Sequence, residues 1–141
     1  MAERRILDKI CADFTAVYYV ELNTGSFEIL HIKRWNQQVK KMNLKQGDNF
    51  NSSADQYAVQ YLYEKERQEF KDWISTGHLK EQLSRKERIT YHYRSKPNPN
   101  QHEFFEAQAV KIYQDEKHFF ALVGFRHIDD IMEKKLRSRI N

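Results

Sequence analysis

Six histidines and one cysteine are the residues of this chain that could bind a metal or carry acid–base chemistry. Zinc sites draw their ligands from short spacings such as H-x-x-x-H or C-x-x-C. No two of these histidines have such a spacing, and Cys11 is far from all of them. The sequence therefore predicts no metal site and no identifiable cofactor. The histidines are His31, His78, His92, His102, His118 and His127.

Other catalytic signatures are missing from the sequence as well. It contains no G-x-S-x-G string, no phosphate-binding loop and no dinucleotide fingerprint. Its carboxylates are scattered, and no pair of them is isolated among apolar neighbours, the setting that raises a carboxyl pKa for catalysis. We therefore expect no catalytic residues. A small α+β enzyme, with a histidine beside a carboxylate in a cavity over a curved sheet, remains the alternative.

The charge of the chain is mixed rather than clustered. Its 24 basic and 20 acidic residues give a net charge of +4. The one modest basic cluster is Lys40, Lys41 and Lys45, whereas a nucleic-acid surface gathers many basic residues on one face. We expect no nucleic-acid partner, and a basic nucleic-acid-binding module is the less favoured alternative.

The expected location is the cytoplasm, without direct membrane contact. Cys11 is the sole cysteine, so no internal disulfide can form, and a reducing compartment is the default. No apolar run approaches the ~18 residues of a membrane span, and the first residues lack the apolar segment of a signal peptide. A longer parent protein could still be anchored elsewhere. A length of 141 residues favours one domain.

Periodicity predicts the elements in order. Apolar residues at helical spacing predict an amphipathic helix within residues 1–14. Residues 16–22 and 27–32 read as a hairpin, and Ser53 with Gln56 predicts a capped helix start. Short helices follow around Trp73 and over 78–83. Alternation predicts strands over 89–94, 104–113 and 118–127, and residues 129–141 read as a final helix.

The last two strands are apolar on both faces, so the sheet they belong to needs a cover on each side. The middle helices can cover one face, and the N-terminal helix or a partner chain can cover the other. The predicted fold class is α+β. It consists of a five-stranded antiparallel sheet with short helices on one face, an N-terminal amphipathic helix and a C-terminal exit helix.

Three strings in this order resemble the PAS domain, a sensory module also called the sensory box. Residues 64–70 resemble its helix start, although Glu66 replaces the usual Asp and the preceding His-Pro is missing. Residues 91–94 resemble a strand that ends in Tyr-Arg. Residues 124–131 resemble the exit segment, with His127-Ile128-Asp129 close to a variant found beside GGDEF output domains. The departures leave open the salt bridge that the family forms at this corner.

The resemblance implies a single domain over 1–141, with an N-terminal helix (1–14), a core (15–128) and an exit helix (129–141). It implies a sensory or regulatory domain of a bacterial signal-transduction protein that forms a homodimer. Such domains are joined to a C-terminal output domain, here one for c-di-GMP turnover: a diguanylate cyclase or a phosphodiesterase, with a histidine kinase as another output. The chain is then part of a longer protein.

The resemblance also indicates where function would lie. A small-molecule ligand would sit between sheet and helices, lined by aromatic residues, although plain core packing is the competing interpretation. Asp129 or Asp130 is expected to cap the exit helix. The candidate ligand-binding residues are Tyr18, Tyr61, Trp73, Tyr91 and Phe105. The candidate signal-transmission residues are Arg126, His127, Ile128, Asp129 and Asp130.

Overall fold

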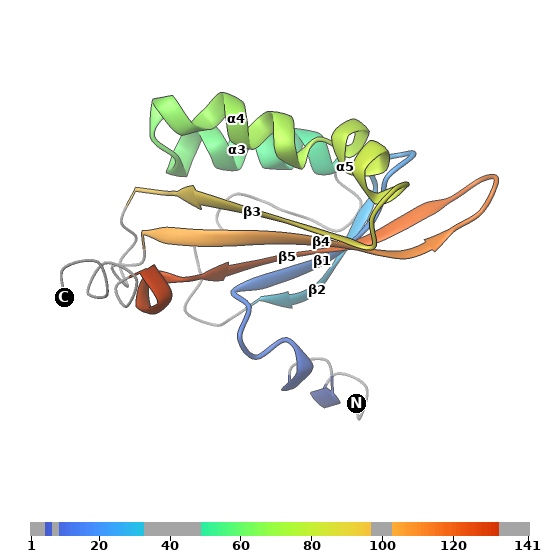
Figure 1. Cartoon of the computed structure of the whole chain (residues 1–141), viewed down its shortest axis with the longest axis horizontal. Helices are drawn as coiled ribbons and strands as arrows, with labels where there is room; N and C mark the ends of the chain where they lie inside the picture. The colour runs from blue at the N-terminus through green and yellow to red at the C-terminus, as the bar shows by residue number, and fades with distance from the viewer. Residues whose placement is uncertain (1–4, 7–8, 33–48, 97–102, 133–141) are drawn as a thin grey trace.

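The computed structural model describes residues 5–6, 9–32, 49–96 and 103–132. One five-stranded antiparallel sheet has the order β2-β1-β5-β4-β3. The closing strand β5 therefore lies in the middle of the sheet, with β1 and β4 hydrogen-bonded to its two edges (Figure 1). The strands are β1 (Ala16–Glu21), β2 (Phe27–Ile32), β3 (Arg88–Arg94), β4 (Phe104–Gln114) and β5 (Phe119–His127).

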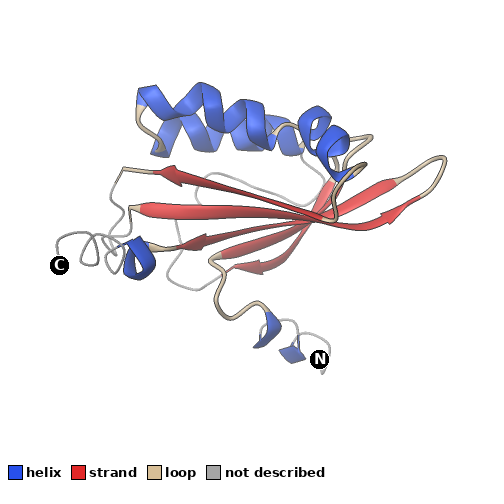
Figure 2. Cartoon of the chain, in the orientation of Figure 1, coloured by secondary structure: helices blue, strands red, loops and turns tan. Residues whose placement is uncertain are grey.

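Three helices, α3 (Phe50–Tyr61), α4 (Glu64–Ile74) and α5 (Thr76–Leu83), lie on one face of this sheet, as Figures 1 and 2 show. The N-terminal residues lie on the opposite side of the sheet (Figure 1). The predicted fold class, a five-stranded antiparallel sheet with short helices on one face, is confirmed.

The start of α3 differs from the sequence prediction. The helix begins at Phe50, because Asn49 is the N-cap and its side chain accepts a hydrogen bond from the backbone N–H of Ser52. Ser53 is buried inside the first turn, so the predicted capping box from Ser53 is wrong. Gly25 explains why Asn49 sits there. It has a φ of 80°, and a Cβ on it would lie 2.6 Å from Asn49 Nδ2.

The core lies between the helices and the inner face of the sheet. Small residues of the central strands, Ala107, Ala109 and Ala121, are completely buried there and let the helices approach closely. Large side chains from the helices, including Phe70 and Leu79, fill the space above them. Burying one such side chain contributes about 1.5–3 kcal/mol, so this interface accounts for much of the stability of the fold.

The outer face is partly covered by the residues that precede β1. Thr15 donates backbone and side-chain hydrogen bonds to the carbonyl of Phe125, at 2.7 and 2.9 Å. The ring of Phe14 then lies on Gly124 of β5, so closely that a Cβ on Gly124 would be 2.9 Å from it. Glycine is needed here because any side chain would push Phe14 off the sheet.

The two terminal helices of the prediction are only partly within the described residues. Residues 5–6 and 9–10 are helical and 11–13 form a turn, while Ile6 and Ile10 are 57% and 73% exposed. Residues 129–132 are helical, and the rest of the expected exit helix, 133–141, lies outside the described residues. Within the part of the chain that the structure describes, no helix is long and apolar enough to cross a membrane.

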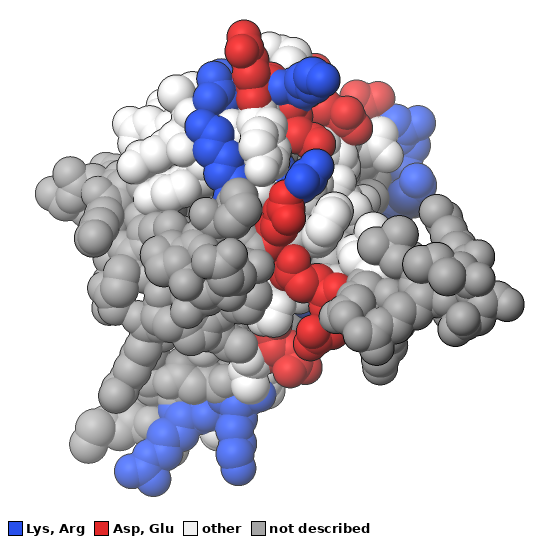
Figure 3. Space-filling model, turned by 90° about the vertical axis from the view of Figure 1, so that its left-hand side faces the viewer, with Lys and Arg blue, Asp and Glu red and all other residues white. Residues whose placement is uncertain are grey.

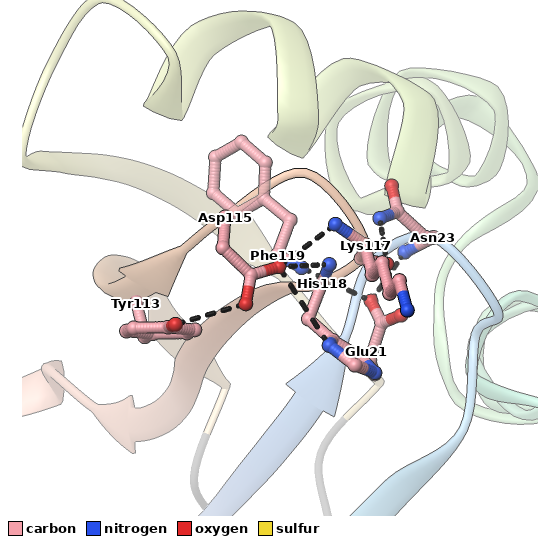
Figure 4. A network of polar contacts seen from close by, with 7 residues as sticks. All are labelled: Glu21, Asn23, Tyr113, Asp115, Lys117, His118 and Phe119. Atoms are coloured by element: carbon pink, nitrogen blue, oxygen red, sulfur yellow. Dashed lines mark hydrogen bonds and ion pairs between the residues drawn. The ribbon is translucent and has the colours of Figure 1, made fainter.

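A polar network ties the β4–β5 turn to the β1–β2 turn (Figure 4). Asp115 accepts hydrogen bonds from the backbone N–H groups of Lys117 and His118, at 2.8 and 2.7 Å. The side chain of Asn23 donates to the carbonyl of Lys117, and Glu21 accepts from the N–H of Asn23. These contacts fix the register of the sheet at the end opposite the exit helix.

Candidate functional site

A row of stacked aromatic rings runs across the inner face of the sheet from its β3 edge. Trp73 of α4 stacks on Tyr91 with ring centroids 5.4 Å apart. Tyr91 is followed by Tyr93 at 6.1 Å, and Tyr93 by Phe105 of β4 at 5.7 Å. The row forms because alternate residues of a strand share one face and neighbouring strands bring their residues side by side.

Two phenol hydroxyls meet at the centre of this layer. Tyr57 of α3 and Tyr93 of β3 are hydrogen-bonded through their hydroxyls at 3.1 Å. Burial raises the pKa of Tyr57 to about 12, although the hydrogen bond with Tyr93 lowers it somewhat. Burial also raises the pKa of Tyr93 and of Tyr18 well above the ordinary value of 10.0. The phenols therefore stay protonated at neutral pH. Since one bond uses one of the pair's two protons, the other can be donated to a third group.

Four of the five predicted ligand residues belong to the core between sheet and helices or pack against it, namely Tyr18, Trp73, Tyr91 and Phe105. Tyr61 is joined to them through Tyr57, so the five do not form one contiguous group by themselves. Tyr18 contacts Phe27, Phe50 and Phe125 edge-on, and Tyr61 packs on Tyr57 at 5.5 Å. The residues that connect the candidates, and that sequence reasoning did not select, are Tyr57, Phe70, Tyr93 and Phe125. Two signals could have found them: Tyr93 has the strand parity of Tyr91, and Tyr57 precedes Tyr61 by one helical turn.

The exit corner, residues 126–130, attaches the start of the final helix to β4. Asp129 Oδ1 accepts hydrogen bonds from the backbone N–H groups of Glu103 and Phe104, at 2.9 and 3.1 Å. The N–H of Ile128 donates to the carbonyl of Phe104 at 2.8 Å, and Ile128 is buried. Of the two residues expected to cap the exit helix, Asp129 or Asp130, Asp129 instead binds backbone N–H groups at the start of the neighbouring strand.

A second set of contacts connects this corner to the helical layer. The N–H of Ser95 donates to the carbonyl of Glu103, and the N–H of Lys96 donates to the carbonyl of Tyr61, both at 2.8 Å. The carboxylate of Glu103 also forms an ion pair with Arg94, whose guanidinium lies over the ring of Tyr63. Arg94 therefore connects the residue before β4 with the ring of Tyr63 between α3 and α4.

On the outer face, the carboxylate of Glu106 joins three strands. It accepts hydrogen bonds from Arg126 Nε at 2.6 Å and from Gln108 Nε2 at 2.9 Å, and it contacts His92 Nε2 at 3.0 Å. Burial alone would raise the pKa of Glu106. The hydrogen bonds from Gln108, His92 and Arg126, with the charge of Arg126, outweigh burial and hold this pKa below its ordinary value. Glu106 therefore stays ionised and keeps Arg126 against the sheet.

The five predicted transmission residues have different surroundings. Arg126 binds Glu106, Ile128 is buried, and His127 Nδ1 is 3.8 Å from Asp129 Oδ2. Asp130 is exposed. Sequence reasoning missed Glu103 and Glu106, whose cationic partners Arg94 and Arg126 lie on other strands and leave no local signal.

The alternative interpretations can be compared with this geometry. The enzyme alternative places a histidine beside a carboxylate in a cavity over the sheet; the His92–Glu106 pair lies on the outer face, and His127 with Asp129 lies at the exit corner. Among the described residues, no three His, Cys, Asp or Glu side chains are grouped as metal ligands. Figure 3 shows acidic side chains in a band across the end of the molecule that lies at the left of Figure 1, with basic ones beside it. Among the described side chains of this face, the basic ones do not gather into one patch; the cluster of Lys40, Lys41 and Lys45 lies outside the described residues.

Comparisons with known proteins concern the fold. No protein-family model and no curated protein matches the chain. The chain is similar to a domain ascribed to a light and redox sensing histidine kinase from Haloarcula marismortui, with 16% identity and a TM-score of 0.48. It is also similar to the PAS domain of a protein from Colwellia psychrerythraea, with 15% identity and a TM-score of 0.46. Each similarity covers 89% of this chain and 98% of the other.

Proposed function

We propose that this chain is a PAS-like sensory or regulatory domain of a bacterial signal-transduction protein. In this proposal a ligand or a second copy changes the packing of the aromatic layer, and the exit helix passes that change to a C-terminal output domain. The output is c-di-GMP turnover, and the domain itself is not a catalyst. The single observation that carries the proposal is the attachment of Asp129 to the first residues of β4.

The proposal follows a continuous set of contacts from the helices to the exit helix. Tyr61, at the end of α3, is bonded to Lys96, and the adjacent Ser95 is bonded to Glu103. Glu103 and Phe104 then hold Asp129. A shift of α3 relative to the sheet would therefore move the backbone that positions the exit helix, since hydrogen-bonded segments move together.

The ligand best suited to this layer is small, flat and apolar, with a hydrogen-bond acceptor on one edge. Aromatic faces such as Trp73 and Tyr91 would stack on it, and the second proton of the Tyr57–Tyr93 pair would be donated to its acceptor. Native mass spectrometry of the purified chain would report whether such a molecule copurifies.

Nuclear magnetic resonance of the isolated chain tests the transmission route. The substitution Tyr57→Phe removes one hydroxyl from the inner layer and should shift the amide resonances of Asp129 to Met132. Tyr19→Phe on the outer face is the matched control, because Tyr19 stacks on Phe120 away from that layer. Shifts confined to the neighbours of residue 57 would contradict the proposal.

The partner in the proposed assembly is a second copy of the chain. Ile6 and Ile10 are exposed on the N-terminal segment, and Tyr113 is exposed at the far end of β4. Two apolar surfaces on one chain can be buried together when two copies meet about a two-fold axis. Sedimentation should show a dimer that Ile10→Asp dissociates, whereas Val59→Asp on exposed α3 leaves it intact. A chain that is monomeric at all concentrations would contradict this assembly.

A further inference from the structure

Strand β3 lies at the edge of the sheet, and the only strand paired with it in the described part of the chain is β4. Lys111 N donates to Glu87 O at 2.9 Å, and Ser95 N donates to Glu103 O at 2.8 Å. Antiparallel strands exchange hydrogen bonds at every second residue, so the odd-numbered residues of β3 bond to β4. The backbone groups that point away from the sheet belong to Arg88, Thr90, His92 and Arg94.

One residue of the chain itself already pairs with this edge. Leu62, between α3 and α4, forms an isolated antiparallel bridge with Ser95, and Tyr61 O accepts from Lys96 N. The chain then turns into α4 and leaves the edge. The fold therefore already places one antiparallel residue beside β3, and a separate strand could continue that pairing from His92 back to Arg88.

The side chains along the edge define what such a strand would carry. Arg88 and Thr90 are exposed on the outer side, and His92 beside them is 51% exposed. On the inner side, Ile89 is partly buried against the core and Tyr91 stacks on Trp73. An incoming strand would match this edge with acidic residues on its outer side and apolar residues on its inner side, because cross-strand pairs favour opposite charges.

A second copy of the chain is disfavoured at this edge in the register centred on Tyr91. A two-fold pairing centred on Tyr91 would place Arg88 opposite Arg94. Like charges directly opposite each other destabilise a strand pair. Basic residues at an edge protect against self-pairing, and the same residues select an acidic partner.

We propose that the β3 edge binds an extended acidic segment of another protein by β-strand addition. Hydrogen bonds with the backbone of Thr90 and His92 hold the segment, and the charge of Arg88 selects its acidic side chains. This inference does not depend on a ligand in the aromatic layer or on the exit helix.

A synthetic peptide of about eight residues that alternates Glu and Val, roughly the length of an ordinary strand, is the probe. Titrated into the labelled chain, it should slow the hydrogen exchange of the Thr90 and His92 amides and shift the resonances of β3. A peptide that alternates Lys and Val should bind at least about tenfold more weakly. Absence of binding by the Glu peptide at ~1 mM, or tighter binding by the Lys peptide, would overturn the proposal.

Two variants separate strand addition from surface attraction. Thr90→Pro removes an outward-pointing N–H and no hydrogen bond to β4, which an edge strand tolerates. It should abolish peptide binding, whereas Thr90→Ala should keep it. Arg88→Glu should lower the affinity for the Glu peptide and raise the affinity for the Lys peptide. It keeps the proposal testable if Thr90→Pro fails to fold. If the Glu peptide binds the Arg88→Glu variant as tightly as the unmodified chain, the β3 edge is not its binding site.

Discussion

The carboxylate of Asp129 accepts a hydrogen bond from the backbone N–H of Phe104 at 3.1 Å, so the first turn of the exit helix is attached to the first residue of β4. The same oxygen accepts from Glu103, and the carbonyl of Phe104 accepts from Ile128. The exit helix is therefore connected to two strands. It follows the central strand β5 in the chain, and its first turn is hydrogen-bonded to the start of the neighbouring strand β4.

The substitution Asp129→Ala should release this attachment and leave two backbone N–H groups without their acceptor. We expect a loss of about 1–2 kcal/mol in the free energy of unfolding with the fold retained. In a full-length parent protein the same change should uncouple the output from the domain. Chemical denaturation and an assay of the output domain measure the two effects.

Asp130→Ala is the matched control for this prediction. Asp130 is exposed one residue further along the helix, so its removal should change stability by less than Asp129→Ala. The comparison distinguishes two adjacent acidic residues that both have the sequence pattern of a helix cap. Equal effects of the two substitutions would show that charge near the helix start matters and that the attachment to β4 does not.

Glu106→Gln keeps the shape of the side chain and removes its charge. Because the folded-state pKa of Glu106 is lowered, its contribution to stability is present above the ordinary value of 4.5 and is lost as the pH falls toward the lowered value. The variant should lose about 2 kcal/mol near neutral pH, where Arg126 loses its anionic partner. It should also lose less stability than the unmodified chain between neutral and acidic pH.

Urea denaturation over a range of pH values measures this dependence. Glu87→Gln is the control, because the Glu87 side chain is 82% exposed and its ion pair with Lys111 Nζ is long, at 3.8 Å. Exposed pairs of this kind contribute little. A Glu106→Gln variant with an unchanged pH profile would be inconsistent with the lowered pKa.

The Tyr57–Tyr93 pair gives a prediction about coupling. Each single change to phenylalanine leaves the other hydroxyl buried without its partner and should cost about 1 kcal/mol. The double variant should cost less than the sum, because it removes both hydroxyls. A double-mutant cycle by thermal denaturation measures this difference, and strict additivity would mean that the hydroxyls do not interact.

Gly124→Ala tests the cover on the outer face. The added Cβ would lie 2.9 Å from the ring of Phe14, so the ring has to move away. We expect a loss of about 1–3 kcal/mol in the free energy of unfolding, the usual cost of overpacking. In a background that carries Phe14→Ala the same change should be nearly neutral. Equal losses in the two backgrounds would place the strain elsewhere.

Much of the sheet could be predicted from the sequence. The alternation of apolar residues identified β1, β2 and β3, and the two-sided apolarity of β4 and β5 indicated strands covered on both faces. These predictions succeed because a strand's side chains alternate between its faces, and that period depends on local backbone geometry alone. Of the aromatic candidates, Tyr18, Trp73, Tyr91 and Phe105 belong to the core or pack against it.

The predictions that failed depend on contacts between distant segments. Ser53 has the local pattern of a helix cap, but the approach of Gly25 to Asn49 moves the start of α3 to Phe50. Asp129 also has the pattern of a cap, yet its carboxylate accepts a hydrogen bond from the backbone N–H of Phe104, 25 residues earlier. Rules based on local sequence do not include such distant partners, because these partners come close only when the sheet forms.

The sequence alone therefore determined the period, type and order of the elements, and with them a sheet covered by helices. Tertiary structure alone decided which strand lies in the centre, which acid holds the exit helix, and that Glu106 joins Arg126, Gln108 and His92. The physical reason is the distance along the chain over which each interaction acts. Side-chain periodicity acts within one segment, whereas hydrogen bonds between strands depend on a register that is set when all five strands pair.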